Sequence, residues 1–173
     1  MLDPGVWLLP VAAGAARAAL AFEQLWPRPL FPLPGTLVAA HEPLVGAWGA
    51  GVYFDLEGDL AGSVALLLRR APRRAAPAAG EGGGESPIPL LLELANIVAS
   101  QVVSAVADAL PGRILLSVPK LVSGSAEREL LRRAGSLVHP ADALRIELPF
   151  AAPAAEPEML LVLLADLPPR GAL

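Results

Sequence analysis

The sequence predicts an α+β fold in which a unit of one long helix and three strands occurs twice. Apolar residues recur with helical spacing in residues 6–26 and again in residues 89–110. Three apolar, extended segments follow each helix, at residues 30–45, 47–56 and 60–69 and then at residues 113–118, 143–150 and 158–166. We therefore expect two long helices packed side by side on a sheet of about six strands.

A short repeated pattern supports the duplication. Arg28 is followed six residues later by Pro34, and Arg113 is followed in the same way by Pro119. In both halves the proline stands at the end of an apolar segment, which is the kind of trace that an internal repeat leaves.

The two halves are joined by a segment of different composition. Residues 71–87 are rich in Pro, Gly, Ala and Arg, which favours a flexible linker. The glycine-rich stretch at residues 80–84 lacks the Gly-Lys-Ser/Thr ending of a phosphate-binding loop. Residues 126–134 have the spacing of a short amphipathic helix. We predict one domain over residues 1–173, with pseudo-repeats at about 5–70 and 88–168.

Composition limits the functional classes. Hydrophobic residues make up 54% of the 173 residues and charged residues only 17%, so apolar surface remains for a partner or a second copy. The net charge of -4 argues against a nucleic-acid-binding protein. The chain has no cysteine, which excludes disulfides, thiolate metal ligands and cysteine nucleophiles, and we expect no metal site.

The start of the chain does not have the features of an export signal. Residues 1–4 include no positive charge, and Arg17 interrupts the apolar run that follows. No stretch reaches the roughly 18 uninterrupted apolar residues of a membrane span. We expect a cytoplasmic protein that binds no membrane.

Polar residues of the second helix gather on one side. At about 100° per residue, Glu93, Asn96, Ser100 and Ser104 share an arc of about 80°, opposite a continuous apolar face. Asn is a mediocre residue for a helix interior, and a Glu among leucines must face water or a partner. On its own this pattern is also typical of a solvated helix face. The small serines would let another protein approach closely.

At these residues the sequence resembles the CheC, CheX and FliY family of response-regulator phosphatases from bacterial chemotaxis. The family signature is Glu-x-x-Asn on a long helix, matched by Glu93 and Asn96. The similarity continues into residues 112–119 (Gly-Arg-Ile-Leu-Leu-Ser-Val-Pro). A second block, residues 58–63 (Gly-Asp-Leu-Ala-Gly-Ser), is similar to the Gly-Asp-Ile-x-Gly-Ser strand of the family.

The resemblance implies an activity and a partner. The chain would hydrolyse the aspartyl phosphate of a phosphorylated CheY-like response regulator, in chemotaxis or related two-component signalling. Asn96 would orient the attacking water, and Glu93 would complete the catalytic pair and anchor the complex. Ser100 and Ser104 would belong to the partner-binding face. The response regulator supplies Mg²⁺, so we expect no cofactor in this chain.

The first helix lacks the second motif that many relatives have. One alignment places Trp7 and Pro10 at the Glu and Asn positions, and a shift by one residue places Leu8 and Val11 there. Neither alternative supplies a polar pair, so we expect at most one active surface per chain. Relatives also have a helix between the third strand and the motif helix, which the proline-rich linker is expected to replace.

Two other functions remain open. A noncatalytic module, like the middle domain of FliM or a degenerate CheC-like protein, would bind a regulator or a flagellar-switch partner without hydrolysis. A homodimeric scaffold would use the excess apolar surface. The intact Glu93 and Asn96 favour the enzyme, whereas the missing first motif favours the binding module.

The remaining polar residues suggest no second site. His41 and His139 have no paired carboxylate nearby in sequence and are interpreted as ordinary loop or strand residues. One basic cluster precedes the linker and is interpreted as a solvated loop or, alternatively, as a surface for an acidic partner. Its members are Arg69, Arg70, Arg73 and Arg74.

Overall fold

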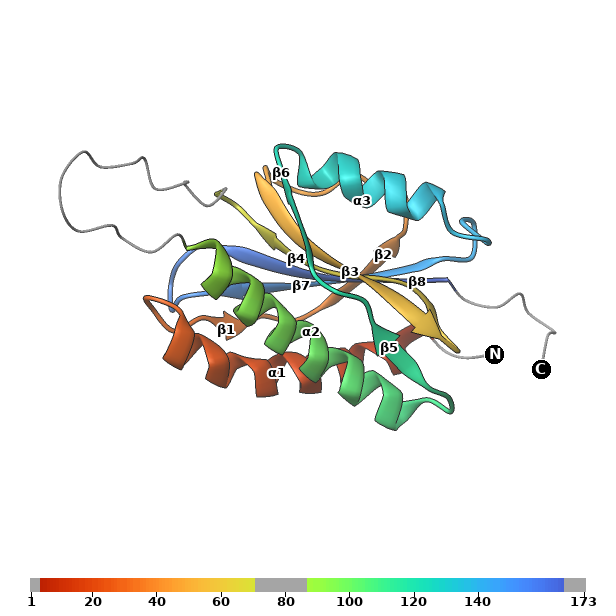
Figure 1. Ribbon diagram of the computed structural model, residues 1–173, viewed down its shortest axis with the longest axis horizontal. Helices are drawn as coiled ribbons and strands as arrows, with labels where there is room; N and C mark the ends of the chain where they lie inside the picture. Colours follow the sequence, from red (N-terminus) through yellow and green to blue (C-terminus); the bar gives the residue numbers. More distant parts are fainter. Residues whose placement is uncertain (1–3, 71–86, 167–173) are drawn as a thin grey trace.

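The computed structural model describes residues 4–70 and 87–166 and shows three α-helices and eight strands within them (Figure 1). The first half contains η1 (Pro4–Trp7), α1 (Leu8–Leu25), β1 (Phe31–Pro32), β2 (Thr36–Ala39), β3 (Ala50–Gly58) and β4 (Ala61–Leu68). The second half contains α2 (Ile88–Ala109), β5 (Ile114–Leu116), β6 (Lys120–Ser123), α3 (Ala126–Gly135), β7 (Leu144–Ala151) and β8 (Met159–Asp166).

All eight strands form one antiparallel sheet with a symmetrical order. The order is β1-β7-β8-β4-β3-β5, with β2 also paired to β7 and β6 also paired to β3. Exchanging each strand of the first half with its counterpart in the second gives the same order in reverse. A duplicated unit would produce this symmetry. The predicted fold class, two long helices packed on a sheet in an α+β domain, is confirmed.

The strand number exceeds the predicted six because both edge segments are divided. The segment expected at residues 30–45 forms β1 and β2, with Pro34 between them. In the second half β5 is followed by the unpredicted β6, with Pro119 between these two strands. Proline has no N–H for a sheet ladder and is confined to edges and interruptions. The two prolines of the repeated pattern therefore interrupt the two edges of the sheet.

Both long helices cover one face of the sheet, and α3 covers part of the other (Figure 1). The helix-side core includes Phe54, Val64, Ile146 and Leu161 from the strands. It is closed by the inward residues of α1 and α2, among them Val11, Ala15, Phe22, Leu94, Val98 and Val102. Tyr53, Leu67 and Val162 from the opposite face pack with Leu130 of α3 in a second, smaller core. The strands thus alternate their side chains between two cores.

The helices α1 and α2 pack closely at Gly14. A Cβ atom added to Gly14 would lie 2.5 Å from Cα of Val102 and 2.8 Å from the carbonyl oxygen of Gln101. Only a residue without a side chain fits this contact. The absence of a side chain at residue 14 therefore sets the spacing of the two long helices.

A turn between β3 and β4 fixes the end of α2. Gly58 has a φ of 106°, a conformation that other residues rarely adopt. The neighbouring Asp59 carboxylate accepts the N–H of Arg113 at 2.6 Å, and the Asp59 N–H donates to the Arg113 carbonyl at 2.9 Å. The Gly-Asp block that resembled the family is thus structural, because it holds the chain where it leaves α2.

The helix α3 is fixed to the sheet by a buried arginine. The Arg133 guanidinium pairs with Asp55 on β3, donates to Ser63 Oγ at 2.9 Å and donates to Glu129 Oε1 at 2.8 Å. It also lies 4.8 Å from the ring centroid of Tyr53. Burial raises the pKa of the Tyr53 hydroxyl, which donates a hydrogen bond of 2.7 Å to the α3 backbone. A buried charge is tolerated here because it is paired and hydrogen-bonded.

The predicted helices agree with the structure. The helices expected at residues 6–26, 89–110 and 126–134 correspond to η1 with α1, to α2 and to α3. The predicted linker at residues 71–87, and the loss of a helix there, fall almost wholly outside the described residues.

Two helical stretches of the described chain, Gly5–Leu25 and Ile88–Ala109, are long and apolar enough to cross a membrane. The sequence analysis did not predict this. This is weak evidence, because the core helix of a soluble protein has the same properties. In this fold both stretches pack one side against the sheet.

Gly14→Ala should destabilise the fold. Alanine is the better helix former by about 1 kcal/mol, but its methyl group would meet the α2 backbone, and overpacking of this kind costs about 1–3 kcal/mol. Thermal and urea unfolding should show a net loss of stability. Gly135→Ala is the matched control, because a Cβ there has no neighbour within 4 Å. Equal stability of the two variants would contradict the tight contact.

The anchoring of α3 should weaken in acid. Hydrogen bonds from Arg132, and from Arg133, lower the pKa of Glu129 from 4.5 to about 2, against the opposing effect of burial. A depressed pKa contributes stability above the unfolded value, and this contribution is lost as pH falls from about 4.5 toward 2. Unfolding midpoints measured from pH 7 to pH 2 should fall less steeply for Glu129→Gln than for the parent.

Glu57→Gln is the control for the acid series, because Glu57 is exposed and has no ion pair within the described part of the chain. Its unfolding midpoints should follow those of the parent. An identical pH dependence for Glu129→Gln and the parent would show that the Glu129 ion pairs add no stability.

Candidate functional site on helix α2

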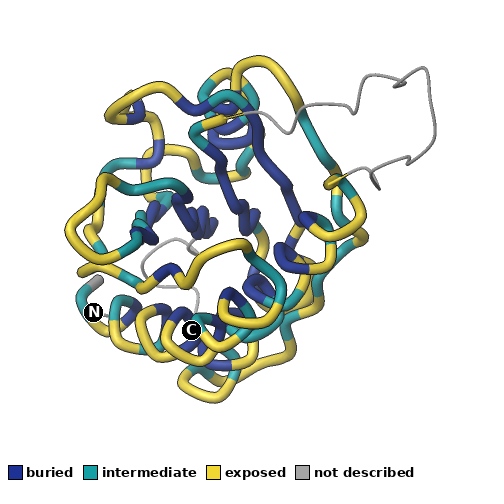
Figure 2. The backbone as a smooth tube through the Cα atoms, turned by 90° about the vertical axis from the view of Figure 1, so that its left-hand side faces the viewer, coloured by how far each residue is buried: buried dark blue, intermediate teal, exposed yellow. Residues whose placement is uncertain are grey.

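The helix α2 presents the predicted polar residues on its outer side. Its inward side is continuous and apolar, so the helix has only one way to lie on the sheet. The buried residues are Leu91, Leu94, Ala95, Val98, Ala99, Val102, Val103, Ala105 and Val106. Figure 2 shows the result for both long helices, at the bottom of the view, where inward turns are buried and outward turns are exposed.

The structure brings all four predicted site residues onto one surface. Glu93, Asn96 and Ser104 are exposed, and Ser100 between them is half-buried. The predicted exposure of Glu93 and Asn96 is confirmed, whereas their roles stay predictions. Residues three apart on a helix have their Cβ atoms about 5–6 Å from each other, so one partner group can reach both side chains.

The polar atoms of the pair are available to a partner. Within residues 4–70 and 87–166, the side chains of Glu93 and Asn96 form no hydrogen bond and no ion pair. The Asn96 carboxamide therefore keeps its two donors and its acceptor, and the Glu93 carboxylate keeps its acceptors. A rigid helix presents both groups without an internal contact that would first have to break.

Asn96 also points away from the neighbouring helix. The α1 backbone lies against Gln101 and Val102 of α2. Five residues separate Asn96 from Gln101, which places their side chains about 140° apart around the helix axis. The other flank of α2 packs against the short strand β5. A partner can therefore approach Asn96 without meeting α1.

Neither candidate pair of the first helix is exposed on the surface. Trp7 and Val11 are buried in the core, and Leu8 and Pro10 are half-buried, so neither pair lies on an outward surface. The exposed residues of α1 are Leu9, Ala12, Ala13, Ala16, Arg17, Leu20, Glu23 and Gln24. They include no Glu and Asn three residues apart, so the described α1 has no counterpart of Glu93 and Asn96.

The basic cluster is only partly a solvated loop. Arg69 donates to the Pro157 carbonyl at 2.8 Å and lies 5.1 Å from the Trp48 ring centroid, so it is a packing residue. Arg70 is exposed, and Arg73 and Arg74 lie outside the described residues.

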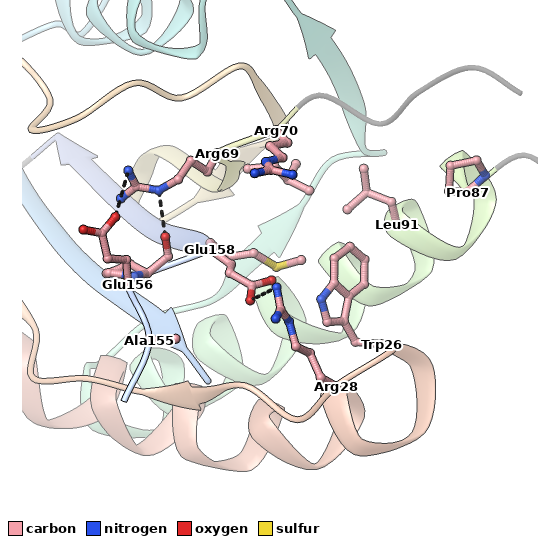
Figure 3. A pocket seen from close by; sticks show the side chains of 12 residues that line it. Trp26, Arg28, Arg69, Arg70, Pro87, Leu91, Ala155, Glu156 and Glu158 are labelled. Carbon is pink, nitrogen blue, oxygen red and sulfur yellow. Dashed lines mark hydrogen bonds and ion pairs between the residues drawn. The ribbon is translucent and has the colours of Figure 1, made fainter. Parts of the chain in front are cut away.

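Arg69 and Arg70 line a pocket of about 470 Å³ between β4, the start of α2 and residues 155–159 (Figure 3). Its apolar lining includes Trp26 and Leu91, and Arg28 at its edge pairs with Glu158. No pattern in the sequence predicts this pocket, because its lining comes from four separate segments.

The histidines and carboxylates do not form a second centre. His41 is exposed in a turn. His139 has its Nδ1 3.3 Å from Asp166 Oδ1, and Asp166 also accepts the backbone N–H groups of Val138 and His139. This contact ties the chain after α3 to the end of β8. No group of three potential metal ligands occurs in residues 4–70 and 87–166.

Solved structures with the same fold come from chemotaxis proteins. A CheC-like superfamily protein from Shewanella sp. PV-4 superposes with a TM-score of 0.58 at 14% identity, over 92% of this chain and 96% of that one. CheX in a CheX–CheY–BeF₃–Mg²⁺ complex from Borrelia burgdorferi gives 0.57 at 14% identity, over 95% and 98%. FliY from Thermotoga maritima gives 0.56 at 11% identity, over 94% and 91%.

This chain therefore has the fold of the CheC, CheX and FliY proteins over nearly its whole length. No protein-family model and no curated protein matches the chain.

Removing the exposed pair should leave the fold intact. Asn96→Ala and Glu93→Ala delete side chains that have no partner in the described part of the chain, and alanine is the better helix former. The free energy of unfolding should change by less than about 0.5 kcal/mol or rise slightly. Urea unfolding measures this. A loss of several kcal/mol would mean that these side chains support the fold.

Proposed function

We propose that this chain is a phosphatase for the aspartyl phosphate of a CheY-like response regulator. The observation that supports the proposal is the pair of exposed side chains Glu93 and Asn96 on the outward face of α2, which have no partner among the residues that the structure describes. Structural similarity adds support, since CheX of the same fold forms a complex with CheY. We place the protein in the cytoplasm, with chemotaxis or a related two-component pathway as its setting.

Asn96 suits the chemistry of hydrolysis. The oxygen of a water attacks phosphorus, the bond from phosphorus to the aspartate carboxylate breaks, and inorganic phosphate leaves with the free carboxylate restored. The transition state is loose and needs little covalent assistance, so positioning the water in line is the main contribution open to a second protein. A carboxamide can hold a water by accepting and donating, and it has no charge to repel the phosphoryl group.

Glu93 is assigned to binding. One helical turn before Asn96, its carboxylate would form a charge-assisted contact with a cationic side chain beside the phosphorylation site of the regulator. Ser100 is half-buried and Ser104 is exposed, and both have short side chains, so the partner can approach this side of α2 closely. The regulator would then lie along α2 with its phosphoryl group at Asn96, and would itself hold the Mg²⁺ that the reaction needs.

Asn96→Ala should abolish acceleration of dephosphorylation. Loss of a positioning group costs about two orders of magnitude in rate, while binding of the regulator should change little. The measurement is phosphate release from a phosphorylated CheY-like regulator, with affinity measured separately. Gln24→Ala is the matched control, because it removes an exposed carboxamide from α1. An Asn96→Ala protein as active as the parent would overturn the assignment.

Glu93→Ala should weaken binding rather than slow the chemical step. Its proposed contact forms before the transition state, so affinity for the phosphorylated regulator should fall while the rate at saturation is largely kept. Glu23→Ala removes an exposed carboxylate from α1 and should change neither quantity. If the parent itself binds the regulator but never accelerates phosphate release, the noncatalytic binding module replaces the enzyme.

A further inference from the structure

The pocket between β4, the start of α2 and residues 155–159 shares no residue with the polar face of α2 (Figure 3). Its volume of about 470 Å³ is within the range of small-molecule sites. Apolar lining comes from Trp26, Leu91 and Met159, among others, and charge comes from three arginines and two glutamates. Mostly apolar walls with a few polar groups are typical of a pocket that binds a small ligand.

The charged groups of the pocket leave one positive charge uncompensated. Glu158 pairs with Arg28, and Glu156 Oε2 lies 3.9 Å from Arg69 Nη1. Arg70 is exposed, and its guanidinium has no hydrogen bond or ion pair among the residues that the structure describes. Three arginines against two glutamates give the pocket a charge of +1, in a chain whose net charge is -4. An anionic group is therefore the favoured partner of Arg70.

Trp26 adds a flat ring and a second hydrogen-bond donor to the same pocket. The residue is half-buried, and its indole N–H has no acceptor within the described part of the chain. Figure 3 shows the ring beside Leu91, with Arg70 above both. The positive end of the α2 dipole lies at Pro87, which also lines the pocket. Free donors and positive charge thus lie next to an apolar wall.

We propose that this pocket binds a small aromatic anion, in which a flat ring carries a carboxylate, sulfonate or phosphate group. The ring packs against the indole of Trp26, because aromatic pairs gain energy beyond the area that they bury. The anionic oxygens accept hydrogen bonds from Arg70, whose planar guanidinium can donate to two oxygens of one group. A cation is disfavoured, since it would lie next to the uncompensated charge of Arg70.

The pocket is separate from the proposed phosphatase site. Its lining does not include Glu93 or Asn96, and binding of a small ligand is measured without a response regulator. Loss of ligand binding and loss of phosphate release are therefore distinguished by different assays and by different variants.

A matched pair of fluorescent probes tests the role of charge on the full chain. Anilinonaphthalene sulfonate is an aromatic anion, and phenylnaphthylamine has the same rings without the sulfonate. Arg70→Gln should weaken binding of the sulfonate about tenfold, the scale of one hydrogen bond to a charged group. Binding of the uncharged amine should not change, because it makes no contact with the guanidinium. A parent that does not bind the sulfonate, or an Arg70→Gln protein that binds it equally well, would overturn the proposal.

Three further variants locate the bound probe. Arg128→Gln is the matched control, because Arg128 is an exposed arginine on α3 whose side chain has no partner in the described chain, and it should bind both probes as the parent does. Trp26→Leu should weaken both probes, since the aromatic wall is lost. Leu20→Glu changes the exposed apolar side of α1 and should leave binding unchanged. Loss of sulfonate binding in Leu20→Glu, with full binding in Trp26→Leu, would place the probe outside the pocket and overturn the proposal.

Discussion

The contact of Gly14 with the backbone of α2 is the constraint on which the arrangement of the long helices depends. Because no side chain separates the helices at this point, their axes approach until backbone meets backbone. Both helices can then cover the same face of the sheet with small inward residues, such as Ala15 and Ala18 of α1 and Ala95 and Ala99 of α2. The opposite sides of both helices remain available to other molecules.

The symmetrical fold has two unlike outer surfaces. The sheet order is unchanged when the halves are exchanged, yet α2 turns Glu93 and Asn96 outward where α1 turns Leu9 and Ala12 outward. Inward positions are constrained alike in both halves by packing, whereas outward positions are not. An internal duplication can therefore keep its architecture while each half acquires a different surface chemistry.

Sequence periodicity predicted those features that depend only on the spacing of apolar and polar residues within one element. The buried side of α2, the central strands β4 and β8, and the exposure of Asn96 all follow from spacing alone. The strand β6 was missed because its four residues begin with Lys120 and end with Ser123, which gives no apolar run. Two alignments of α1 stayed open because its first two turns are apolar on every side, so no polar residue marked the outer face there.

Other features depend on contacts between distant residues. Arg133 is anchored by Asp55 and Ser63, which precede it by 78 and 70 residues. Arg69 is held by Pro157, which follows it by 88 residues. In the sequence these arginines are indistinguishable from solvated ones, because only the folded chain brings their partners together.

The prolines that divide the sheet edges have a further consequence for how copies of this chain can meet. An open sheet edge is a template on which another strand can align, and long flat edges lead to fibrous aggregation. Here each edge consists of two short strands, β1 and β2 at one edge and β5 and β6 at the other, none longer than four residues. Pro34 and Pro119 lie between the two strands of each edge, so neither edge offers a long, flat template for the sheet of another molecule. This protection matters in a chain with more than half of its residues hydrophobic, because such a sequence is otherwise prone to aggregate through exposed strands.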